Sequence, residues 1–170
     1  MPRASVILTS YNHAKFICES IESVLAQTFS DFELLILDDA STDNSWELIN
    51  QYDDPRIKAF RSEGAGEVGL RINAAISGIA QGEYIAIHNS DDIWEFDKLE
   101  RQITYLDEHA SIAAVFTNAL PIDENGLPLN DQSHFYSTIF NQPTRSRHEW
   151  LRHFFNHGNA LCHPSVLIRK

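Results

Sequence analysis

Two short apolar runs in this 170-residue chain each lead into a pair of aspartates. One run ends at Asp38 and Asp39, and the other is followed, after three polar residues, by Asp91 and Asp92. A continuous apolar run of this length predicts a strand buried on both faces, and ligands of such sheets bind beyond the carboxyl ends of the strands. Four carboxylates at one edge would raise one another's pKa unless a cation or hydrogen-bond donors offset the charge. The sequence therefore predicts a site for a metal ion and a polar ligand.

Strand-like runs alternate with segments of helical periodicity along most of the chain. Ile17, Ile21 and Val24, for example, recur at helical spacing between the first two predicted strands. This alternation is typical of βαβ units and predicts an α/β fold with a mostly parallel sheet. The predicted strands cover residues 4–9, 34–37, 56–60, 84–87, 112–117 and 165–168. Helices are predicted around 17–25, 46–49, 72–79 and 99–109 and over 146–156, with a turn at 123–126 that predicts a hairpin or an excursion from the main sheet.

The composition is that of a globular domain with a strongly acidic charge. A formal net charge of −11 argues against a basic patch and so against nucleic acid as a partner. The longest apolar stretches fall far short of the roughly 20 residues of a membrane helix, and the N-terminus lacks the pattern of a signal peptide. Cys18 and Cys162 fit neither a disulfide framework nor a zinc site, and they predict buried thiols in a reducing compartment. We therefore expect a cytoplasmic location.

Three glycines, Gly64, Gly66 and Gly69, reproduce the G-x-G-x-x-G spacing of dinucleotide-binding loops. That motif needs a position directly after the first buried strand and an acidic residue about 20 positions later. Here the glycines follow a weak, polar strand well inside the chain. The sequence favours a flexible loop near a ligand over NAD or FAD binding.

Two blocks of the sequence, from Pro2 to Leu48 and from Asn73 to Gln102, closely resemble the N-terminal half of the family 2 glycosyltransferases. The segments that carry the resemblance are SVILTSYN at 5–12, SVLAQT at 23–28, LDDASTD at 37–43, GEYIA at 82–86, NSDDIW at 89–94 and KLERQ at 98–102. The resemblance implies a GT-A fold, a Rossmann-like three-layer α/β/α sandwich. It predicts one domain over 1–170, in which 1–117 binds the nucleotide sugar and 118–170 begins the acceptor side.

By this resemblance, Asp91 and Asp92 lie in the family's metal-binding segment. Mg²⁺ or Mn²⁺ there would bridge the donor diphosphate, and carboxylate oxygens are the ligands that such cations prefer. Which aspartate contacts the metal stays open, as does the alternative that the pair only caps the next helix. The family commonly has Asp-Ala-Asp-Asp where this chain has Asn89-Ser90-Asp91-Asp92. Asn89 keeps an acceptor oxygen for a ribose hydroxyl but attracts a cation less than a carboxylate does.

The resemblance also implies a nucleotide pocket beyond the first two strands. Asp38 or Asp39 would accept from the ring N–H of a uracil, with the alternative that one of them, Asp39 included, only caps the following turn. Tyr11 would stack on the base or simply pack, and Arg71 would approach the diphosphate or lie at the surface. The residues implied for nucleotide binding are Thr9, Tyr11, Asn12, Asp38, Asp39, Arg71, Asn89 and Asp91.

The implied activity is inverting transfer of a sugar from a nucleotide-diphosphate sugar, most often a UDP-sugar, to a saccharide or lipid-linked acceptor in cell-surface polysaccharide synthesis. This reaction needs a general base, which the family carries in an acidic motif beyond Lys170. Because the chain ends on a strand-like segment, we expect a fragment that carries the donor site, from a protein that acts at the inner face of the membrane. Neither the sugar, the linkage nor the oligomeric state follows from the sequence.

Two other functions compete with this interpretation. A nucleotide-sugar-binding module without turnover is compatible with Asn89 and with a missing base. A phosphoacceptor receiver domain also carries paired aspartates after an apolar strand. It would need a lone aspartate after its third strand and a lysine after its fifth, and Phe60-Arg61 and Thr117-Asn118 supply neither.

Overall fold

The computed structural model describes residues 1–129, 136, 139–140 and 142–170. It divides into two compact units, Met1–Val115 with Leu167–Lys170, and Phe116–Val166, which are taken separately below. Within the described residues, none of the helices combines the length and the hydropathy needed to cross a bilayer.

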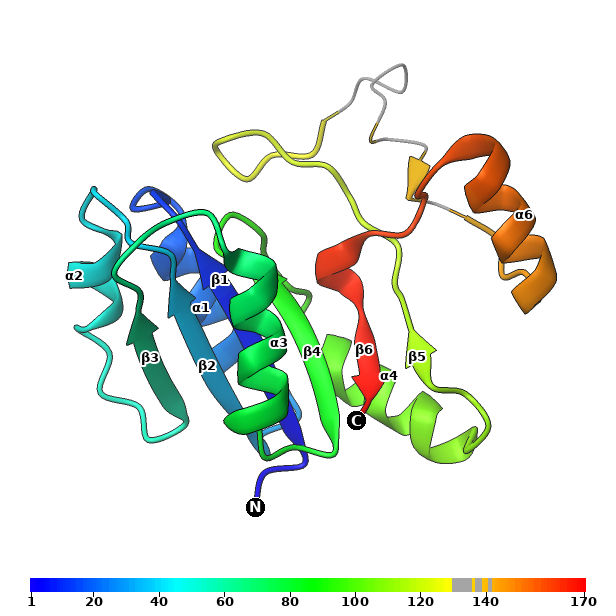
Figure 1. Ribbon diagram of the computed structural model, residues 1–170, viewed down its shortest axis with the longest axis horizontal. Helices are drawn as coiled ribbons and strands as arrows, with labels where there is room; N and C mark the ends of the chain where they lie inside the picture. The colour runs from blue at the N-terminus through cyan, green and yellow to red at the C-terminus, as the bar shows by residue number, and fades with distance from the viewer. Residues whose placement is uncertain (130–135, 137–138, 141) are drawn as a thin grey trace. The chain divides into compact units, whose positions relative to one another are not determined.

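The first unit is built on a six-stranded sheet in the order β3-β2-β1-β4-β6-β5 (Figure 1). Strands β3, β2, β1 and β4 are parallel neighbours, and β6 pairs antiparallel with both β4 and β5. The strands are β1 (Ala4–Ser10), β2 (Phe32–Asp38), β3 (Ile57–Arg61), β4 (Tyr84–Asn89), β5 (Ala114–Val115) and β6 (Leu167–Arg169). The predicted α/β fold with a mostly parallel sheet is confirmed.

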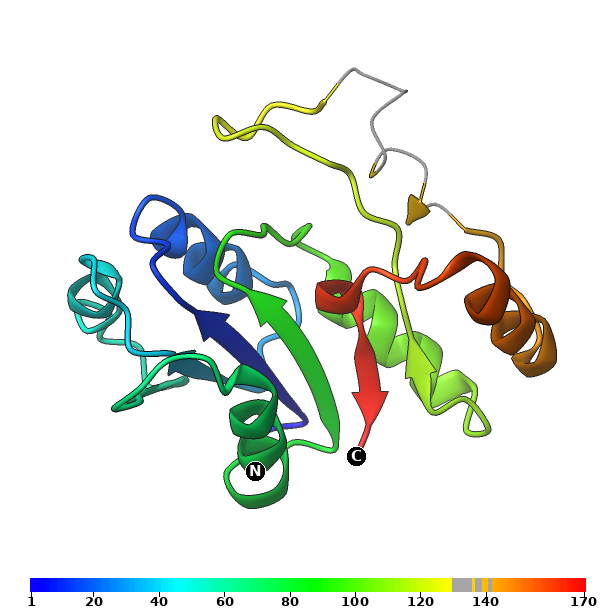
Figure 2. The same ribbon diagram turned by 45° about the horizontal axis from the view of Figure 1, so that its top comes forward.

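Helices cover both faces of this sheet, with α3 on one face and α1 and α4 on the other (Figures 1 and 2). The helices of this unit are α1 (Ile17–Leu25), α2 (Ser45–Ile49), α3 (Val68–Gly78) and α4 (Lys98–Glu108). Alternate residues of each strand point to opposite faces. Val6, Leu34 and Ala86 accordingly join the apolar residues of α1 and α4 in one buried cluster. Because both faces are covered, β1 and β2 are buried at almost every position.

Gly82 marks the tight connection from α3 into β4. A Cβ atom at this position would lie 2.5 Å from the backbone carbon of Ala4 and 2.5 Å from the backbone nitrogen of Ser5. These are atoms of β1, which is paired on both sides. The backbone of β1 therefore has no room to move away, and only glycine fits here.

We expect Gly82→Ala to lower the free energy of unfolding by about 2 to 3 kcal/mol, because the added methyl group overpacks against fixed backbone. Urea unfolding followed by circular dichroism measures this change. Gly78→Ala is the matched control, since a Cβ atom there meets nothing within 4 Å. Equal stability of the two variants would contradict the prediction.

The described residues of the second unit include a short hairpin, an α-helix and a 3-10 helix. Ile122 bridges Pro128 in antiparallel fashion around the predicted turn at 123–126, whose Gly126 has a φ of +77°. Much of the remaining predicted excursion, up to residue 142, lies outside the described residues. Helix α6 (Arg147–His157) confirms the helix expected over 146–156, and a capping box between Ser146 and Glu149 starts it.

Three expectations about the C-terminal part and the cysteines are wrong in detail. The strand expected over 112–117 is only two residues long, because a turn closed by Ile112 N–H and His109 C=O still occupies its start. The strand expected over 165–168 begins at Leu167, because a 3-10 helix, His163–Ser165, precedes it. Cys18 and Cys162 are partly exposed free thiols and not buried ones.

Candidate functional site

The carboxyl ends of β1, β2 and β4 lie level at one edge of the sheet. Ser10 is in register with Asp38, and Thr9 is in register with Asn89. Backbone hydrogen bonds continue this alignment past the strand ends, from Asp39 N–H to Ser10 C=O at 2.8 Å and from Ser90 N–H to Thr9 C=O at 3.1 Å. The sheet therefore brings the segments that carry both acidic pairs to the same edge, where a parallel sheet binds its ligands.

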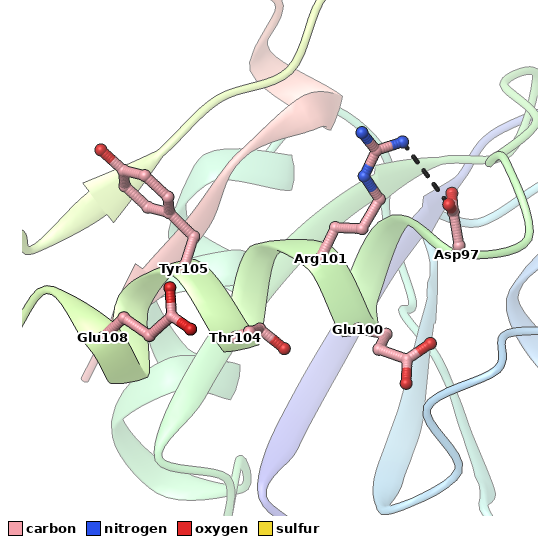
Figure 3. A pocket seen from close by; sticks show the side chains of 6 residues that line it. All are labelled: Asp97, Glu100, Arg101, Thr104, Tyr105 and Glu108. Carbon is pink, nitrogen blue, oxygen red and sulfur yellow. Dashed lines mark hydrogen bonds and ion pairs between the residues drawn. The ribbon is translucent and has the colours of Figure 1, made fainter.

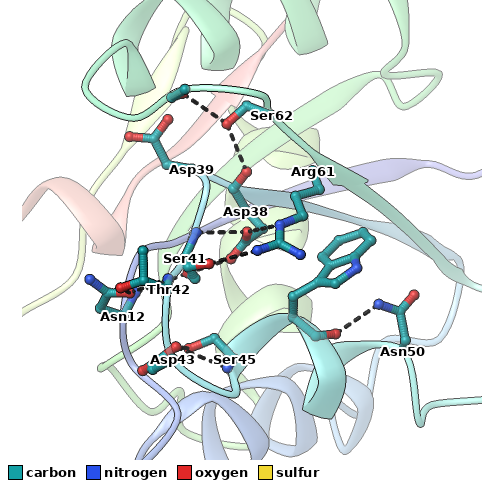
Figure 4. Close-up of polar contacts among 12 residues, drawn as sticks. Asn12, Asp38, Asp39, Ser41, Thr42, Asp43, Ser45, Asn50, Arg61 and Ser62 are labelled. Atoms are coloured by element: carbon teal, nitrogen blue, oxygen red, sulfur yellow. Dashed lines mark hydrogen bonds and ion pairs between the residues drawn. The ribbon is translucent and has the colours of Figure 1, made fainter.

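The loops that follow β1 and β2 are joined by side-chain to backbone hydrogen bonds. Asn12 Oδ1 accepts from Thr42 N–H at 2.7 Å, and Asn12 N–H donates to the Ser41 hydroxyl at 3.0 Å (Figure 4). Asn12 and Ala40 adopt left-handed φ angles of 54° and 60°. For residues other than glycine this conformation costs of order 1 kcal/mol, and it persists only where surrounding contacts fix it. These bonds fix the two loops to each other, and we call the joined loops the loop unit. The Asn12 acceptor oxygen is already used inside it.

Asp38 lies inside the loop unit. Its Oδ2 accepts from Ser41 N–H at 3.0 Å, and its Oδ1 accepts from the Ser41 hydroxyl at 2.5 Å (Figure 4). Arg61 Nε lies 3.5 Å from Oδ2, and the Asp38 side chain is fully buried. The turn-capping role that the sequence left open within the pair therefore belongs to Asp38.

Asp39 faces the glycine loop instead. Its Oδ2 accepts from Gly66 N–H at 2.7 Å, and its Oδ1 lies 3.2 Å from Arg71 Nε. Oδ1 is buried and, among the described residues, makes no hydrogen bond, so this atom keeps acceptor capacity. Arg71 also donates to the Gly64 carbonyl, and its side chain is only 22% exposed. Arg71 thus points toward Asp39 and not into solvent.

The second acidic pair combines a half-exposed and a more buried carboxylate. Burial, together with the negative charge of Asp91, raises the pKa of Asp92 to about 6, although a hydrogen bond with Asn89 and the proximity of His13 partly oppose the shift. A nearby cation stabilises the ionised form of such a carboxylate, because its attraction offsets both the burial and the negative charge of Asp91. The described residues contain no cluster of three or more His, Cys, Asp or Glu side chains able to hold a metal. Two carboxylates nevertheless fit Mg²⁺, which typically takes one or two of them plus substrate phosphates.

His13 is a residue at this edge that the sequence analysis missed. Its Nδ1 lies 2.8 Å from the Ser90 hydroxyl and 3.8 Å from Asp91 Oδ1. The backbone N–H of His13 donates to the Ser45 hydroxyl at 3.0 Å, so the loop unit fixes its position. A polar residue just beyond the first strand was the available signal, but only the strand register brings it beside Asp91.

The remaining predicted pocket residues lie where a ligand can reach them. Tyr11 is 48% exposed, so it does not pack into the core, and Thr9 is half-buried at the end of β1. A separate hollow runs along the outer face of α4 (Figure 3). It is lined by Asp97, Glu100, Arg101, Thr104, Tyr105 and Glu108 and contains none of the predicted site residues. The candidate site is therefore the sheet edge and not this hollow.

Comparison with known proteins decides the family. A family model described as Glycosyl transferase family 2 matches residues 5–169. The chain belongs to glycosyltransferase family 2. An *Escherichia coli* relative, the UDP-Glc:alpha-D-GlcNAc-diphosphoundecaprenol beta-1,3-glucosyltransferase WfgD, is 40% identical over 124 residues, which are 72% of this chain and 48% of that protein. The chain spans about half the length of the curated relatives it matches.

Solved structures of glycosyltransferases share the fold. Residues 1–349 of *Staphylococcus aureus* TarS, crystallised with UDP, superpose with a TM-score of 0.72 at 24% identity, over 99% of this chain and 47% of that one. The mannosyltransferase PcManGT of *Pyrobaculum calidifontis*, in complex with GDP-Man and Mn²⁺, gives a TM-score of 0.62 at 24% identity, over 73% of this chain and 37% of that one. These likenesses confirm the GT-A fold of this family 2 chain.

Proposed function

We propose that this chain forms the donor site of an inverting, metal-dependent glycosyltransferase that uses a UDP-sugar. The observation that carries the proposal is the level sheet edge, where the acceptor oxygen of Asp39 and the carboxylates of Asp91 and Asp92 follow neighbouring strands. The relatives' properties support it, since WfgD is named for UDP-Glc and TarS is solved with UDP. The acceptor we propose is a saccharide or lipid-linked saccharide in polysaccharide synthesis, reached from the cytoplasmic face of the membrane.

In this proposal Asp39 recognises the base. Its Oδ1 accepts the imide N–H of uracil, while Arg71 and Gly66 hold the carboxylate in place. Cytosine presents an acceptor at the same ring position, which leaves the carboxylate facing a lone pair. Thr9 and Tyr11 line the pocket, with the exposed Tyr11 ring available for stacking. Asp38 and Asn12 act on the nucleotide indirectly, by fixing the loops that present these groups.

The proposed metal ligands are Asp91 and Asp92, with Mg²⁺ or Mn²⁺ as the cation; the complex of PcManGT with Mn²⁺ supports this choice. The cation, when bound, neutralises charge on the leaving diphosphate. Asn89 contributes an amide to the ribose side of the site. Asp91, the more exposed carboxylate at 48%, is open to ligand oxygens, and His13 beside it limits the freedom of its side chain.

Sugar transfer further requires a general base that removes the acceptor hydroxyl proton as the oxygen attacks the anomeric carbon. We place this base, following the family's motif order, after residue 170. The carboxylates at the described edge already have roles in base recognition, loop structure and cation binding. The chain itself is therefore proposed to bind the donor, and turnover is proposed for a protein of the length of its relatives.

Titration calorimetry of the 170-residue chain with UDP, with and without Mn²⁺, tests the proposal. We expect UDP to bind, and Mn²⁺ to tighten binding by about tenfold, the equivalent of about 1.4 kcal/mol. CDP serves as the base control and should bind at least about tenfold more weakly, since it leaves the Asp39 acceptor unpaired. Absence of UDP binding under both conditions would contradict the proposed function.

A further inference from the structure

Three polar residues in and just after α1 are not yet used by the proposed site. Ser20 and Ser23 lie in α1 at a spacing of three, so they share one side of the helix, and Gln27 follows two residues after the helix ends. Ser20 is 1% exposed and Gln27 is 5% exposed, which is unusual for residues with so many hydrogen-bonding groups. We call these three residues the α1 polar edge. Ser23 and Gln27 belong to the SVLAQT segment, which resembles the family but for which the sequence suggested no role.

The α1 polar edge binds the segment that carries Asp91 and Asp92 at its amino end. The Ser20 hydroxyl lies 3.0 Å from the Asn89 carbonyl, to which it donates, and 3.0 Å from His88 Nε2. His88 is completely buried and packs against Trp94, with ring centroids 4.5 Å apart and the rings tilted by 46°. The last residues of β4 are thereby fixed immediately before the acidic pair.

The α1 polar edge also contacts the carboxyl end of the segment that carries Asp91 and Asp92. Trp94 N–H donates to the Ser23 hydroxyl at 3.2 Å. The Gln27 carboxamide donates to the Glu95 carbonyl at 2.8 Å and accepts from Leu99 N–H at 2.9 Å. A third bond, from Gln27 Nε2 to the Ser23 carbonyl at 3.1 Å, fixes the carboxamide orientation. The Gln27 side chain therefore forms hydrogen bonds with backbone groups of Glu95 and Leu99, where the segment that carries Asp91 and Asp92 leads into α4.

These contacts matter because the segment between them carries two carboxylates that repel each other. Asp91 and Asp92 are adjacent carboxylates, and their charges oppose each other when no cation is bound. If the loop were held at one end only, the two carboxylates could move apart and reduce this repulsion. Binding a cation would then require the loop to become ordered again. Fixation at residues 89, 94, 95 and 99 removes that freedom. Prior ordering of ligands strengthens binding because less conformational freedom is lost on association.

We propose that the α1 polar edge, and Gln27 above all, positions Asp91 and Asp92 for the cation and thereby sets how strongly a divalent cation promotes nucleotide binding. The inference rests on the proposed function of the sheet edge as a UDP site. Gln27 is a positioning residue in this proposal, because its contacts are to backbone groups of the acidic segment. It predicts that the metal-dependent and metal-independent parts of UDP binding respond differently to the loss of Gln27.

Gln27→Met tests this, because methionine keeps the length and packing of the side chain but none of its three hydrogen bonds. Ser5→Ala is the matched control. Ser5 is also completely buried, and its hydroxyl also joins a side chain, Glu33, to a loop amide, Gly82 N–H, but at the amino ends of the strands. Both variants lose buried hydrogen bonds, so a general loss of stability appears in both. Thermal unfolding establishes the temperature at which each variant is folded, and binding is measured below it.

The readouts are calorimetry with UDP alone, calorimetry with UDP and Mn²⁺, and hydrogen exchange of the Leu99 amide. For Gln27→Met we expect the tightening by Mn²⁺ to shrink at least about fivefold, with binding of UDP alone within about twofold of wild type, on the scale of losing two or more hydrogen bonds to backbone. The Leu99 amide should exchange faster than in wild type. Ser5→Ala should keep the full Mn²⁺ effect.

The outcomes separate the inference from the proposed function. If wild type binds UDP without any Mn²⁺ effect, both are overturned. If wild type shows the effect and Gln27→Met keeps it, only the inference is overturned. If Gln27→Met and Ser5→Ala lose UDP binding with and without Mn²⁺ to the same extent, Gln27 serves stability alone and the inference is again overturned. Ser23→Ala removes the partner of Trp94 N–H and a hydrogen bond to the Ser20 carbonyl within α1, but it keeps the Gln27 contacts, so it should give a smaller loss in the same direction.

Discussion

Replacing Asp92 with asparagine is expected to remove the Mn²⁺-dependent part of UDP binding and, at the same time, to stabilise the metal-free chain above pH 6. Asparagine offers one neutral acceptor oxygen in place of a carboxylate, and neutral ligands hold Mg²⁺ or Mn²⁺ less strongly. We expect the roughly tenfold tightening by Mn²⁺ to disappear within error, on the scale of losing one charged ligand. UDP binding without the cation should stay within about twofold. Calorimetry at pH 8 measures both quantities.

The stability half of this prediction follows from the raised pKa of Asp92. Burial, and then the charge of Asp91, moves that pKa up to about 6 in the folded chain, whereas the unfolded chain keeps an ordinary aspartate. The folded state therefore binds the proton more tightly, and the stability of wild type falls as the pH rises from below the ordinary pKa through about 6. Asp92→Asn lacks this titration, so its melting temperature should exceed that of wild type at pH 8 and match it more closely near pH 4.

Asp97→Asn is the control for both halves. Asp97 lies five residues after Asp92, directly before α4, and its carboxylate pairs with Arg101 at 3.5 Å. The substitution removes the same charge close to the acidic segment but outside the proposed cation ligands. It should leave the Mn²⁺ effect and the pH dependence of melting unchanged. An Asp92→Asn chain that retained the full Mn²⁺ effect would show that Asp92 is not a ligand.

Acidification of wild type offers an independent check. Because the Asp92 carboxyl holds its proton up to about pH 6, protons compete with the cation below that value. The Mn²⁺ effect on UDP binding should therefore decline between pH 7 and pH 5, whereas UDP binding alone should change little.

The sequence predicted those parts of the fold in which burial leaves a periodic signal. Strands β1, β2 and β4 are buried on both faces and appear as continuous apolar runs, and the face of α1 that contacts them repeats Ile17, Ile21 and Val24. β5 is the edge strand, β6 lies between it and β4, and the two are two and three residues long. Segments so short carry no period, and turns on either side of them shift their limits.

The candidate site was predictable as a location but not in its internal arrangement. Parallel strands that end in aspartates place both pairs at one edge. The difference between Asp38 and Asp39 lies in their contacts, since Asp38 accepts from Ser41 whereas Asp39 accepts from Gly66 N–H, and the left-handed residue Ala40 stands between Asp39 and Ser41. The Asn12–Thr42 bond joins two loops 30 residues apart in sequence. Such contacts between loops leave no pattern in the sequence.

The second large effect is expected at the opposite end of the strands, where Glu33→Ala should lower the free energy of unfolding by about 3 kcal/mol at pH 7. Glu33 is 4% exposed and accepts from the Ser5 hydroxyl at 2.7 Å, from Gln81 N–H at 2.7 Å and from Lys58 Nζ at 2.8 Å. Alanine leaves Ser5 and Gln81 N–H buried or partly buried without their acceptor, whereas the half-exposed Lys58 returns to water.

Acid unfolding distinguishes the contribution of the Glu33 charge to stability from the contribution of its side-chain shape. Burial alone would raise the pKa of this carboxyl, but the hydrogen bonds from Lys58, Gln81 N–H and Ser5 outweigh burial and hold it below its ordinary value. Its stabilising contribution is thus complete above the unfolded pKa and is lost as the pH falls through the folded pKa. Glu33→Gln keeps the shape without the charge, so urea unfolding should find it less stable than wild type at pH 7, with the gap narrowing as the pH falls below 4. A gap that stayed constant over this range would contradict the prediction, because the difference in stability would then not depend on the ionisation of Glu33.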